Sequence, residues 1–401
     1  MTSDDIVLKV EDLYVNFYTY EGVVHALDGV NFELRRGDTM GLVGETGCGK
    51  SVTSKAILRL IDPPGRIESG RVLLYLDDPS TGQKTPVDIL QLPEKKMLEI
   101  RGNKIGIVFQ DPATYPNPVF KIGDQIAEVI QIHQDLSRDA LLCKIEELEK
   151  LMASSTSSSR NASASGQTTS LMNRVSPERV NAQIEQYRSM LDNPPKPDNK
   201  SLKMAAKRRA IQMLRMVKMP APERVAEQYP HEMSGGMRQR ALIAMALASD
   251  PLVLICDEAT TALDVTVQAQ VLRLLNELKT KVGSSIIIIT HDLGIVAETC
   301  NRVTVMYAGT VIESTSVCEL FGNPMHPYTI GLLKAVPKLH EQKEKLDQIP
   351  GSVPNLITPP PGCRFHPRCS FATDICKREK PELIEIRPDH KVACHHPQGK
   401  F

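Results

Sequence analysis

The chain has no tryptophan, no long apolar run and no excess of either charge, and the last two absences exclude whole classes of protein. Acidic and basic side chains balance at 48 each, whereas a dedicated nucleic-acid-binding protein usually carries a basic excess. The isoleucine run at residues 286–289 is far shorter than the roughly 20 apolar residues of a transmembrane helix. The opening Met-Thr-Ser-Asp-Asp lacks the basic and apolar segments of a signal peptide. We therefore expect a cytosolic protein that reaches a membrane only through partners.

The 401 residues, of which 41% are hydrophobic, suffice for two domains or for one large domain with appendages. The nine cysteines indicate metal binding or free thiols in a reducing compartment, where disulfides are rare.

Residues 44–51 read Gly-Glu-Thr-Gly-Cys-Gly-Lys-Ser, which matches the phosphate-binding P-loop. The apolar residues 39–43 predict a buried strand before the loop, and residues 51–61 have helical spacing after it. Such glycines let successive backbone N–H groups point at one anion, and the helix start adds its positive dipole end. A glycine turn that merely caps a helix would not explain the Lys-Ser pair. The predicted nucleotide-binding residues are Gly44, Glu45, Thr46, Gly47, Cys48, Gly49, Lys50 and Ser51, with Lys50 on the β- and γ-phosphates and Ser51 on Mg²⁺.

Residues 6–34 alternate apolar and polar side chains, which predicts an antiparallel hairpin with a turn near Glu21 and Gly22. Several aromatic side chains lie there, and we select Tyr20 as the candidate that stacks on a nucleotide base. Ordinary packing within the strands explains any one of these rings equally well.

Two predicted strands end in polar residues that suit a metal and a water molecule. Gln110 follows residues 104–109, and ligands of open α/β sheets bind at the carboxyl ends of strands. Asp257 and Glu258 follow residues 252–256, which supplies one carboxylate for Mg²⁺ and a neighbour that polarises water.

A second anion cradle and a histidine complete the pattern. Ser234, Gly235 and Gly236 precede a predicted helix and offer a hydroxyl and free N–H groups. His291 follows the predicted strand 286–290 and can contact a γ-phosphate. Each motif alone is explained by a helix cap or a strand end, but together and in this order they indicate nucleotide hydrolysis.

The middle of the chain is predominantly helical in its spacing, except for one segment. Residues 153–170 hold eleven Ser or Thr in eighteen positions and predict disorder. Residues 203–218 predict a basic amphipathic helix whose charges form a solvated face, with lipid headgroups as the alternative contact.

Together these motifs resemble those of the nucleotide-binding subunits of ABC transporters. The matching motifs are Walker A at 44–51, Gln110 in the Q-loop, the signature at 233–237, Walker B at 252–257 with Glu258, the D-loop at 262–264 and the switch residue His291. Within that superfamily, the chain is similar to the oligopeptide/dipeptide/nickel importers. The similarity lies in Met237-Arg-Gln-Arg240, residues 301–309, residues 323–328 and the proline-rich, cysteine-bearing tail 349–396.

The resemblance implies an α/β fold, a P-loop NTPase ABC ATPase domain with a RecA-like core, an antiparallel β subdomain and a helical subdomain. We place this domain at residues 1–325, with the helical subdomain at about 112–245 and a partly disordered insertion at about 142–203. Residues 326–401 would form a small Cys-rich C-terminal extension.

The resemblance also implies the mechanism. Two subunits would sandwich ATP between the P-loop of one and Ser234, Gly235 and Gly236 of the other. Glu258 would orient the attacking water, His291 would contact the γ-phosphate, and Gln110 and Asp257 would join Ser51 at Mg²⁺. The residues implied to be catalytic are Glu258, His291 and Gln110.

The implied function is ATP hydrolysis that powers the import of di- or oligopeptides from the cytoplasmic face of the plasma membrane, where the chain would be peripheral. The implied partners are a homologous second ATPase subunit, two transmembrane permease subunits and an extracytoplasmic peptide-binding protein, with no nucleic acid. The alternative is a soluble ABC ATPase of DNA repair, translation or iron–sulfur assembly, which would share every nucleotide motif.

Four cysteines in the tail, Cys363, Cys369, Cys376 and Cys394, are separated by five, six and seventeen residues. Disulfides are rare in a reducing cytosol, and structural zinc usually draws on tighter Cys-x₂₋₄-Cys spacings. Four thiolates on longer loops suit a 4Fe–4S cubane, and the tail resembles family members that carry such a cluster. We expect a 4Fe–4S cluster here, with zinc, free thiols or disulfides as alternatives, and His395 and His396 as neighbours rather than ligands.

Overall fold

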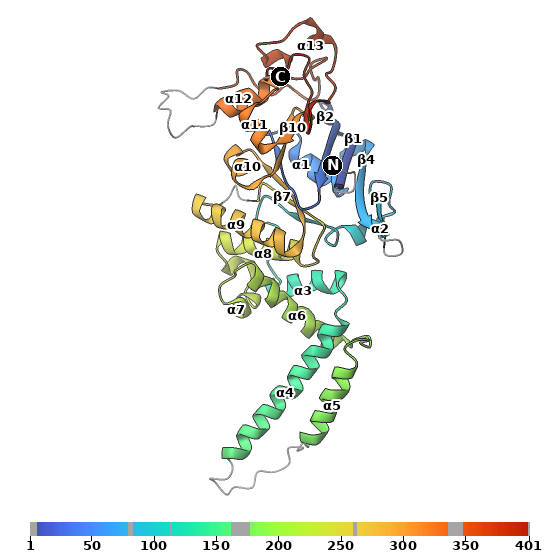
Figure 1. The fold of residues 1–401 in the computed structure, drawn as a ribbon, viewed down its shortest axis with the longest axis vertical. Coiled ribbons are helices and arrows are strands. Elements are labelled where there is room, and N and C mark those ends of the chain that lie inside the picture. The colour runs from blue at the N-terminus through green and yellow to red at the C-terminus, as the bar shows by residue number, and fades with distance from the viewer. Residues whose placement is uncertain are drawn as a thin grey trace. The chain divides into compact units, whose positions relative to one another are not determined.

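The computed structural model describes residues 6–78, 83–112, 114–161, 177–259, 263–335 and 348–399, with the backbone alone for residues 154–161 and Pro177. The chain divides into two compact units, drawn in Figure 1. Unit 1 comprises Met1–Tyr115 and Asp250–Phe401, and unit 2 comprises Pro116–Ser249.

Unit 1 contains an eight-stranded sheet with the order β11-β12-β10-β9-β3-β8-β7-β6. Its parallel part is formed by β3 (Thr39–Val43), β6 (Ile105–Val108), β7 (Val253–Asp257), β8 (Ser285–Thr290) and β9 (Arg302–Tyr307). Strands β3, β7 and β8 are buried along their whole length, which explains why they read as continuous apolar runs. Because parallel strands end at one edge of the sheet, the polar residues that follow them gather there.

The second sheet of unit 1 is antiparallel, with the order β2-β1-β4-β5. Strands β1 (Ile6–Thr19) and β2 (Gly22–Arg35) form the predicted hairpin, and β4 (Gly65–Asp77) and β5 (Lys84–Asp88) complete the sheet. The hairpin closes at Thr19 opposite Gly22, so the prediction from the alternating pattern is confirmed.

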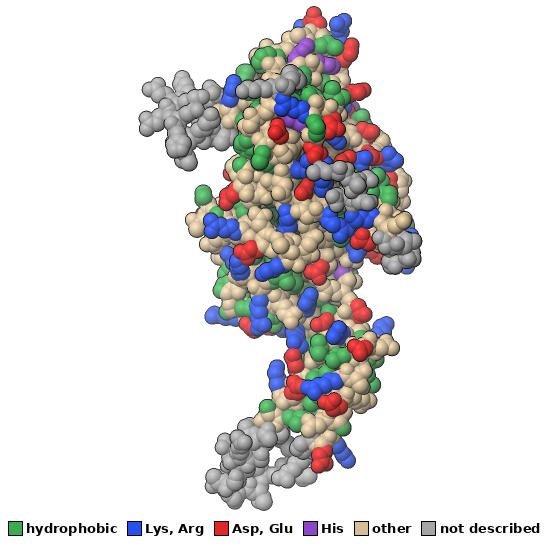
Figure 2. Space-filling view, in the orientation of Figure 1, with side chains coloured by type: hydrophobic (Ala, Val, Ile, Leu, Met, Phe, Trp, Pro, Cys, Tyr) green, Lys and Arg blue, Asp and Glu red, His purple; other side chains and the backbone are tan. Residues whose placement is uncertain are grey.

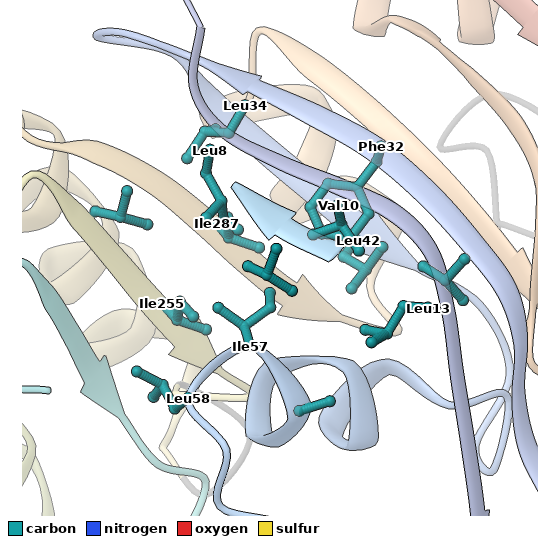
Figure 3. Close-up of a cluster of buried hydrophobic side chains, with 14 of the residues drawn as sticks. Leu8, Val10, Leu13, Phe32, Leu34, Leu42, Ile57, Leu58, Ile255 and Ile287 are labelled. Atoms are coloured by element: carbon teal, nitrogen blue, oxygen red, sulfur yellow. The ribbon is translucent and has the colours of Figure 1, made fainter. Parts of the chain in front are cut away.

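One hydrophobic core joins the two sheets of unit 1. Figure 3 shows side chains of β1 and β2, such as Leu8 and Phe32, meeting Leu42 of β3 and Ile57 of helix α1 (Lys50–Ile57). Burying side chains of this size stabilises the fold by about 1.5–3 kcal/mol each. The P-loop, which connects β3 to α1, is therefore anchored at both ends in this core.

The remaining elements of unit 1 surround the parallel strands. They are α2 (Glu94–Ile100), α9 (Val265–Val282), α10 (Leu293–Thr299), β10 (Thr310–Ser316), α11 (Val317–Gly322), α12 (Pro327–Ala335), the 3₁₀ helix η4 (His366–Arg368), α13 (Asp374–Arg378), β11 (Ile384–Arg387) and β12 (His390–Val392). The last two strands extend the large sheet through antiparallel pairing with β10. The C-terminal segment is therefore built into unit 1 and shares a second core with it, centred on Tyr307, Tyr328 and Phe365.

Unit 2 is helical. Its elements are α3 (Ile122–His133), α4 (Ser137–Asn161), α5 (Pro177–Ser189), α6 (Asn199–Met216), α7 (Pro222–Ala226), the 3₁₀ helix η3 (Pro230–Glu232) and α8 (Gly235–Leu247). Figure 1 shows α4 and α5 as a helical hairpin, in which Ile145, Val180 and Ile184 form a small core.

The predicted disorder of residues 153–170 is wrong for its first part, because α4 continues as a helix to Asn161. Composition suggested disorder, but adding a residue to a formed helix is much easier than starting one. Helix α4 begins in a segment rich in Leu, Glu and Lys and continues from there into the serine-rich part. Residues 162–170 lie outside the described residues.

The predicted basic helix corresponds to α6, which has two faces. Ala205, Ala210 and Met213 belong to its buried side. Several basic side chains are paired: Lys207 lies beside Glu227, and Arg208 beside Glu146 at 2.7 Å. These pairs with acidic side chains are consistent with the predicted solvated face.

Candidate nucleotide site

The P-loop backbone follows a path that only glycine allows at two positions. Gly44 and Gly49 have φ values of 153° and 101°. A Cβ atom at Gly44 would lie 2.2 Å from the carbonyl oxygen of Met306, and one at Gly49 would lie 2.7 Å from Leu27. Glycine is therefore required at both positions.

Lys50 is the first residue of α1, and its side chain folds back over the loop. The ammonium donates to the carbonyl oxygens of Gly44 at 2.8 Å and Glu45 at 3.1 Å, and the residue is only 5% exposed. The loop thus holds a positive charge beside the N–H groups of its own backbone, which is the environment that phosphate oxygens require.

Ser51 and Asp257 meet at the carboxyl end of β7. The Ser51 hydroxyl donates to Oδ1 of Asp257 at 2.9 Å, and the Ser54 hydroxyl donates to Oδ2 at the same distance. Burial raises the pKa of Asp257, and the two hydroxyl groups act in the opposite direction. The resulting set of oxygen atoms is the chemistry that Mg²⁺ prefers.

Glu258 lies between the two other predicted catalytic residues. Its carboxylate accepts a hydrogen bond from the amide nitrogen of Gln110 at 2.7 Å and lies 3.4 Å from Nδ1 of His291. The Glu258 side chain is 14% exposed, whereas Gln110 and His291 are exposed. Three residues from the ends of β6, β7 and β8 are thus brought together beside Asp257, as the sequence predicts.

The other predicted residues lie at a turn in unit 1 and at a helix start in unit 2. Tyr20 lies in the turn after β1 with a fully exposed side chain. Ser234 caps helix α8 in unit 2, where it accepts from the N–H of Met237 at 3.4 Å, and Ser234 and Gly235 are exposed. Gly236 follows in the first turn of the same helix. Exposure of this kind leaves them available to another molecule.

Sequence reasoning missed a direct connection between the C-terminal segment and the P-loop. Arg368 makes a two-pronged ion pair with Glu45, with N–O distances of 2.8 and 3.1 Å, and its side chain is 6% exposed. Tyr328 adds a second link, because its hydroxyl accepts the backbone N–H of Glu45 at 2.9 Å. The only signal in the sequence is the position of Arg368 directly before Cys369.

We expect Arg368→Met to weaken ATP binding. The variant removes the cation that neutralises Glu45, so the Glu45 carboxylate would repel the phosphates of ATP. We expect the binding free energy to weaken by about 1–2 kcal/mol, which lowers the affinity roughly tenfold. Titration of the purified protein with a fluorescent ATP analogue measures the effect. Arg378→Met is the matched control, since Arg378 contacts only the Asp374 carbonyl of its own helix among the contacts described. Equal affinities in wild type and Arg368→Met would show that the ion pair has no role in nucleotide binding.

The four tail cysteines line one small cavity, together with His326, Phe365 and other aromatic and histidine side chains. All nine cysteines of the chain are free thiols. Burial raises the pKa of Cys363, Cys369 and Cys394, in the last case to about 12. In Figure 2, histidine side chains gather over this C-terminal part of unit 1. The cysteines predicted as one site from the sequence are therefore neighbours in the fold.

Within the described ranges, no group of three or more His, Cys, Asp and Glu side chains is arranged to hold a metal ion.

The strand, glycine loop and helix, with Lys50, Ser51 and Asp257 around them, define a P-loop nucleotide-hydrolysing protein. Residues 27–261 match the family model described as "ABC transporter", and residues 312–376 match the one described as "Oligopeptide/dipeptide transporter, C-terminal region". The chain belongs to the ATP-binding proteins of the ABC transporter family.

Similar curated proteins cover almost the whole chain. A probable peptide ABC transporter ATP-binding protein, y4tR of Sinorhizobium fredii, is 42% identical over 97% of this chain and 95% of its own length. The oligopeptide transport ATP-binding protein OppD of Bacillus subtilis is 40% identical over 96% of this chain and 87% of its own. OppD of Escherichia coli is 39% identical over 98% and 94%.

Among solved structures, the ATP-binding cassette MJ0796 in a dimeric post-hydrolysis state is similar in fold, with a TM-score of 0.50. It is 22% identical, and the match covers 77% of this chain and 98% of that one. The predicted family, the α/β ABC ATPase fold and the ATPase activity are thus confirmed, and ATP and Mg²⁺ are the substrate and metal expected of the family. In the parts of the chain that the structure describes, no helix is both long and apolar enough to cross a bilayer.

Proposed function

We propose that this chain is the ATP-hydrolysing subunit that powers the import of di- or oligopeptides through an ABC transporter. One observation carries the proposal. The P-loop site is joined, through the ion pair of Glu45 with Arg368, to a tail of the oligopeptide/dipeptide transporter type. The names of the relatives at about 40% identity support the same substrate class. They do not favour a soluble ABC ATPase of DNA repair, translation or iron–sulfur assembly.

The residues act on ATP in separate roles. Lys50 and the loop N–H groups bind the phosphates, and Ser51 and Asp257 hold Mg²⁺ with Gln110 close by. When bound, Mg²⁺ neutralises charge on the phosphate oxygens. Glu258 orients the attacking water and takes up its proton, while His291, whose ring lies 3.4 Å from that carboxylate, contacts the γ-phosphate.

The exposed residues contribute between chains. Ser234, Gly235 and Gly236 bind the ATP that is held by the P-loop of a second ATPase subunit, because a helix start with free N–H groups attracts phosphate. Tyr20 stacks on the base. The second subunit is a homologue of this chain, and the domain arrangement is that of residues 1–325 with helical residues about 112–245, followed by the extension 326–401.

The remaining partners are two transmembrane permease subunits and an extracytoplasmic peptide-binding protein. The chain would then be a peripheral protein at the cytoplasmic face of the plasma membrane. Cell fractionation followed by purification through a tag on this chain tests the arrangement. We expect the tagged chain in the membrane fraction, with a homologous ATPase and two permease chains co-isolated in equal amounts. Recovery from the soluble fraction without membrane-spanning chains would contradict it.

We also propose that Cys363, Cys369, Cys376 and Cys394 hold a 4Fe–4S cluster. The four thiols are free and line one cavity, and a cubane binds each thiolate at a different iron atom, so its ligands stay farther apart than those of a single ion. When bound, the cluster cross-links loops that otherwise share little apolar core.

A further inference from the structure

His326 lines the four-cysteine cavity but belongs to a different part of the chain, immediately before α12. The residue is 1% exposed. Its nearest ring neighbour is Phe365, at a centroid distance of 5.7 Å, which lines the same cavity. Nothing in the nucleotide mechanism uses this buried imidazole.

The hydrogen bonds around His326 determine which ring nitrogen carries the proton. Nδ1 accepts the backbone N–H of Tyr328 at 3.0 Å. A nitrogen that accepts an N–H has no proton of its own, so the imidazole is neutral and its proton is on Nε2. The Tyr328 hydroxyl in turn accepts the backbone N–H of Glu45, so the residue that holds the His326 ring is itself held by the P-loop.

Nε2 of His326 is buried and has no hydrogen-bond partner among the residues that the structure describes. A buried N–H without an acceptor is costly and rare in native proteins. The face of Phe365 would be only a weak acceptor. The four cysteine sulfurs line the same cavity, so a sulfur atom held by them would supply the acceptor that this N–H lacks.

We propose that the Nε2–H of His326 donates a hydrogen bond to a sulfur atom of the iron–sulfur cluster held by the four cysteines. The inference rests on the cluster proposed above and adds a fifth residue to the site. His326 is a positioning residue: it binds no iron, but its N–H stabilises negative charge on sulfur. Because reduction adds negative charge to the cluster, such a bond raises the reduction potential.

The test compares midpoint potentials in anaerobically purified, full-length protein, followed by EPR during a redox titration. His326→Phe keeps a flat ring and removes the donor. We expect reduction of its cluster to be about tenfold less favourable, which moves the midpoint potential ~59 mV to the negative side for one electron. His326→Gln keeps an N–H donor and is expected to lie closer to wild type.

His395→Phe is the matched control. His395 lines the same cavity, but its Nε2 lies 3.0 Å from the carbonyl oxygen of Glu379, so its N–H already has an acceptor. We expect the midpoint potential of this variant to match wild type. An equal shift in His395→Phe and His326→Phe would overturn the inference, because the effect would then reflect the packing of the cavity.

Two further results separate this inference from the proposed cluster. Colourless wild-type protein without iron would overturn both. Protein with four irons per chain and an unchanged midpoint in His326→Phe would overturn the hydrogen bond alone. Should His326→Phe fail to retain iron, hyperfine spectroscopy of wild-type protein with ¹⁵N-labelled histidine decides. Coupling of a histidine nitrogen and an exchangeable proton to the reduced cluster is expected, and its absence would overturn the inference.

Discussion

Glu258→Gln is expected to bind ATP with near-normal affinity and to hydrolyse it at least about a hundredfold more slowly. The amide keeps the shape of the side chain and its contact with Gln110 but cannot accept a proton from water. The P-loop, Lys50 and Asp257 are untouched, so the nucleotide stays bound. Single-turnover hydrolysis and equilibrium ATP binding, measured on the same preparation, separate the two effects.

Lys50→Ala provides the contrasting variant. It removes the cation that lies over the P-loop, so the variant is expected to be impaired already in the binding of ATP. If Glu258→Gln hydrolysed ATP at the wild-type rate, the water-activating role would belong to another residue. If it lost ATP affinity as Lys50→Ala does, Glu258 would be part of the binding site rather than of the chemistry.

Cys369→Ser is expected to abolish the brown colour and absorption near 400 nm of anaerobically purified protein and to release its approximately four irons per chain. A serine hydroxyl is a poor substitute for a thiolate ligand, and Cys369 lines the cavity with the other three cysteines. Iron and acid-labile sulfide analyses measure the loss. ATP binding should persist, because both the P-loop residues and Arg368, which pairs with Glu45, are unchanged.

Cys318→Ser is the matched control, since Cys318 is an exposed thiol of α11 that does not line the cavity. Its iron content should equal that of wild type. Wild-type protein that is colourless and carries one zinc ion per chain would instead establish the zinc alternative.

The nucleotide site could be predicted from the sequence because each of its parts is local. A P-loop needs only a strand, a glycine turn and a helix in succession, and the core that anchors Leu42 and Ile57 follows from apolar runs. Asp257, Glu258 and His291 could be placed together because parallel strands end at one edge. That argument required only that β7 and β8 be neighbours in one sheet.

The contacts of the tail could not be predicted in the same way. Arg368 and Glu45 are 323 positions apart, and no pattern of spacing links them. The position of the proton on His326 depends on the backbone N–H of Tyr328, which only the folded turn brings into range. The disorder predicted for residues 153–161 failed for the opposite reason: composition describes a segment in isolation, whereas α4 enters it already formed.

Peptide uptake into proteoliposomes measures whether ATP hydrolysis at this site drives peptide import. The complex isolated through this chain would be reconstituted, with its co-purified permease chains, into proteoliposomes. ATP would be enclosed in the lumen, on the side of the ATPase subunits. A labelled di- or oligopeptide library would be added outside together with the binding protein. We expect ATP-dependent accumulation of peptide with wild-type protein and none with Glu258→Gln. Hydrolysis by the wild-type complex without accumulation of any peptide, or equal accumulation with Glu258→Gln, would contradict it.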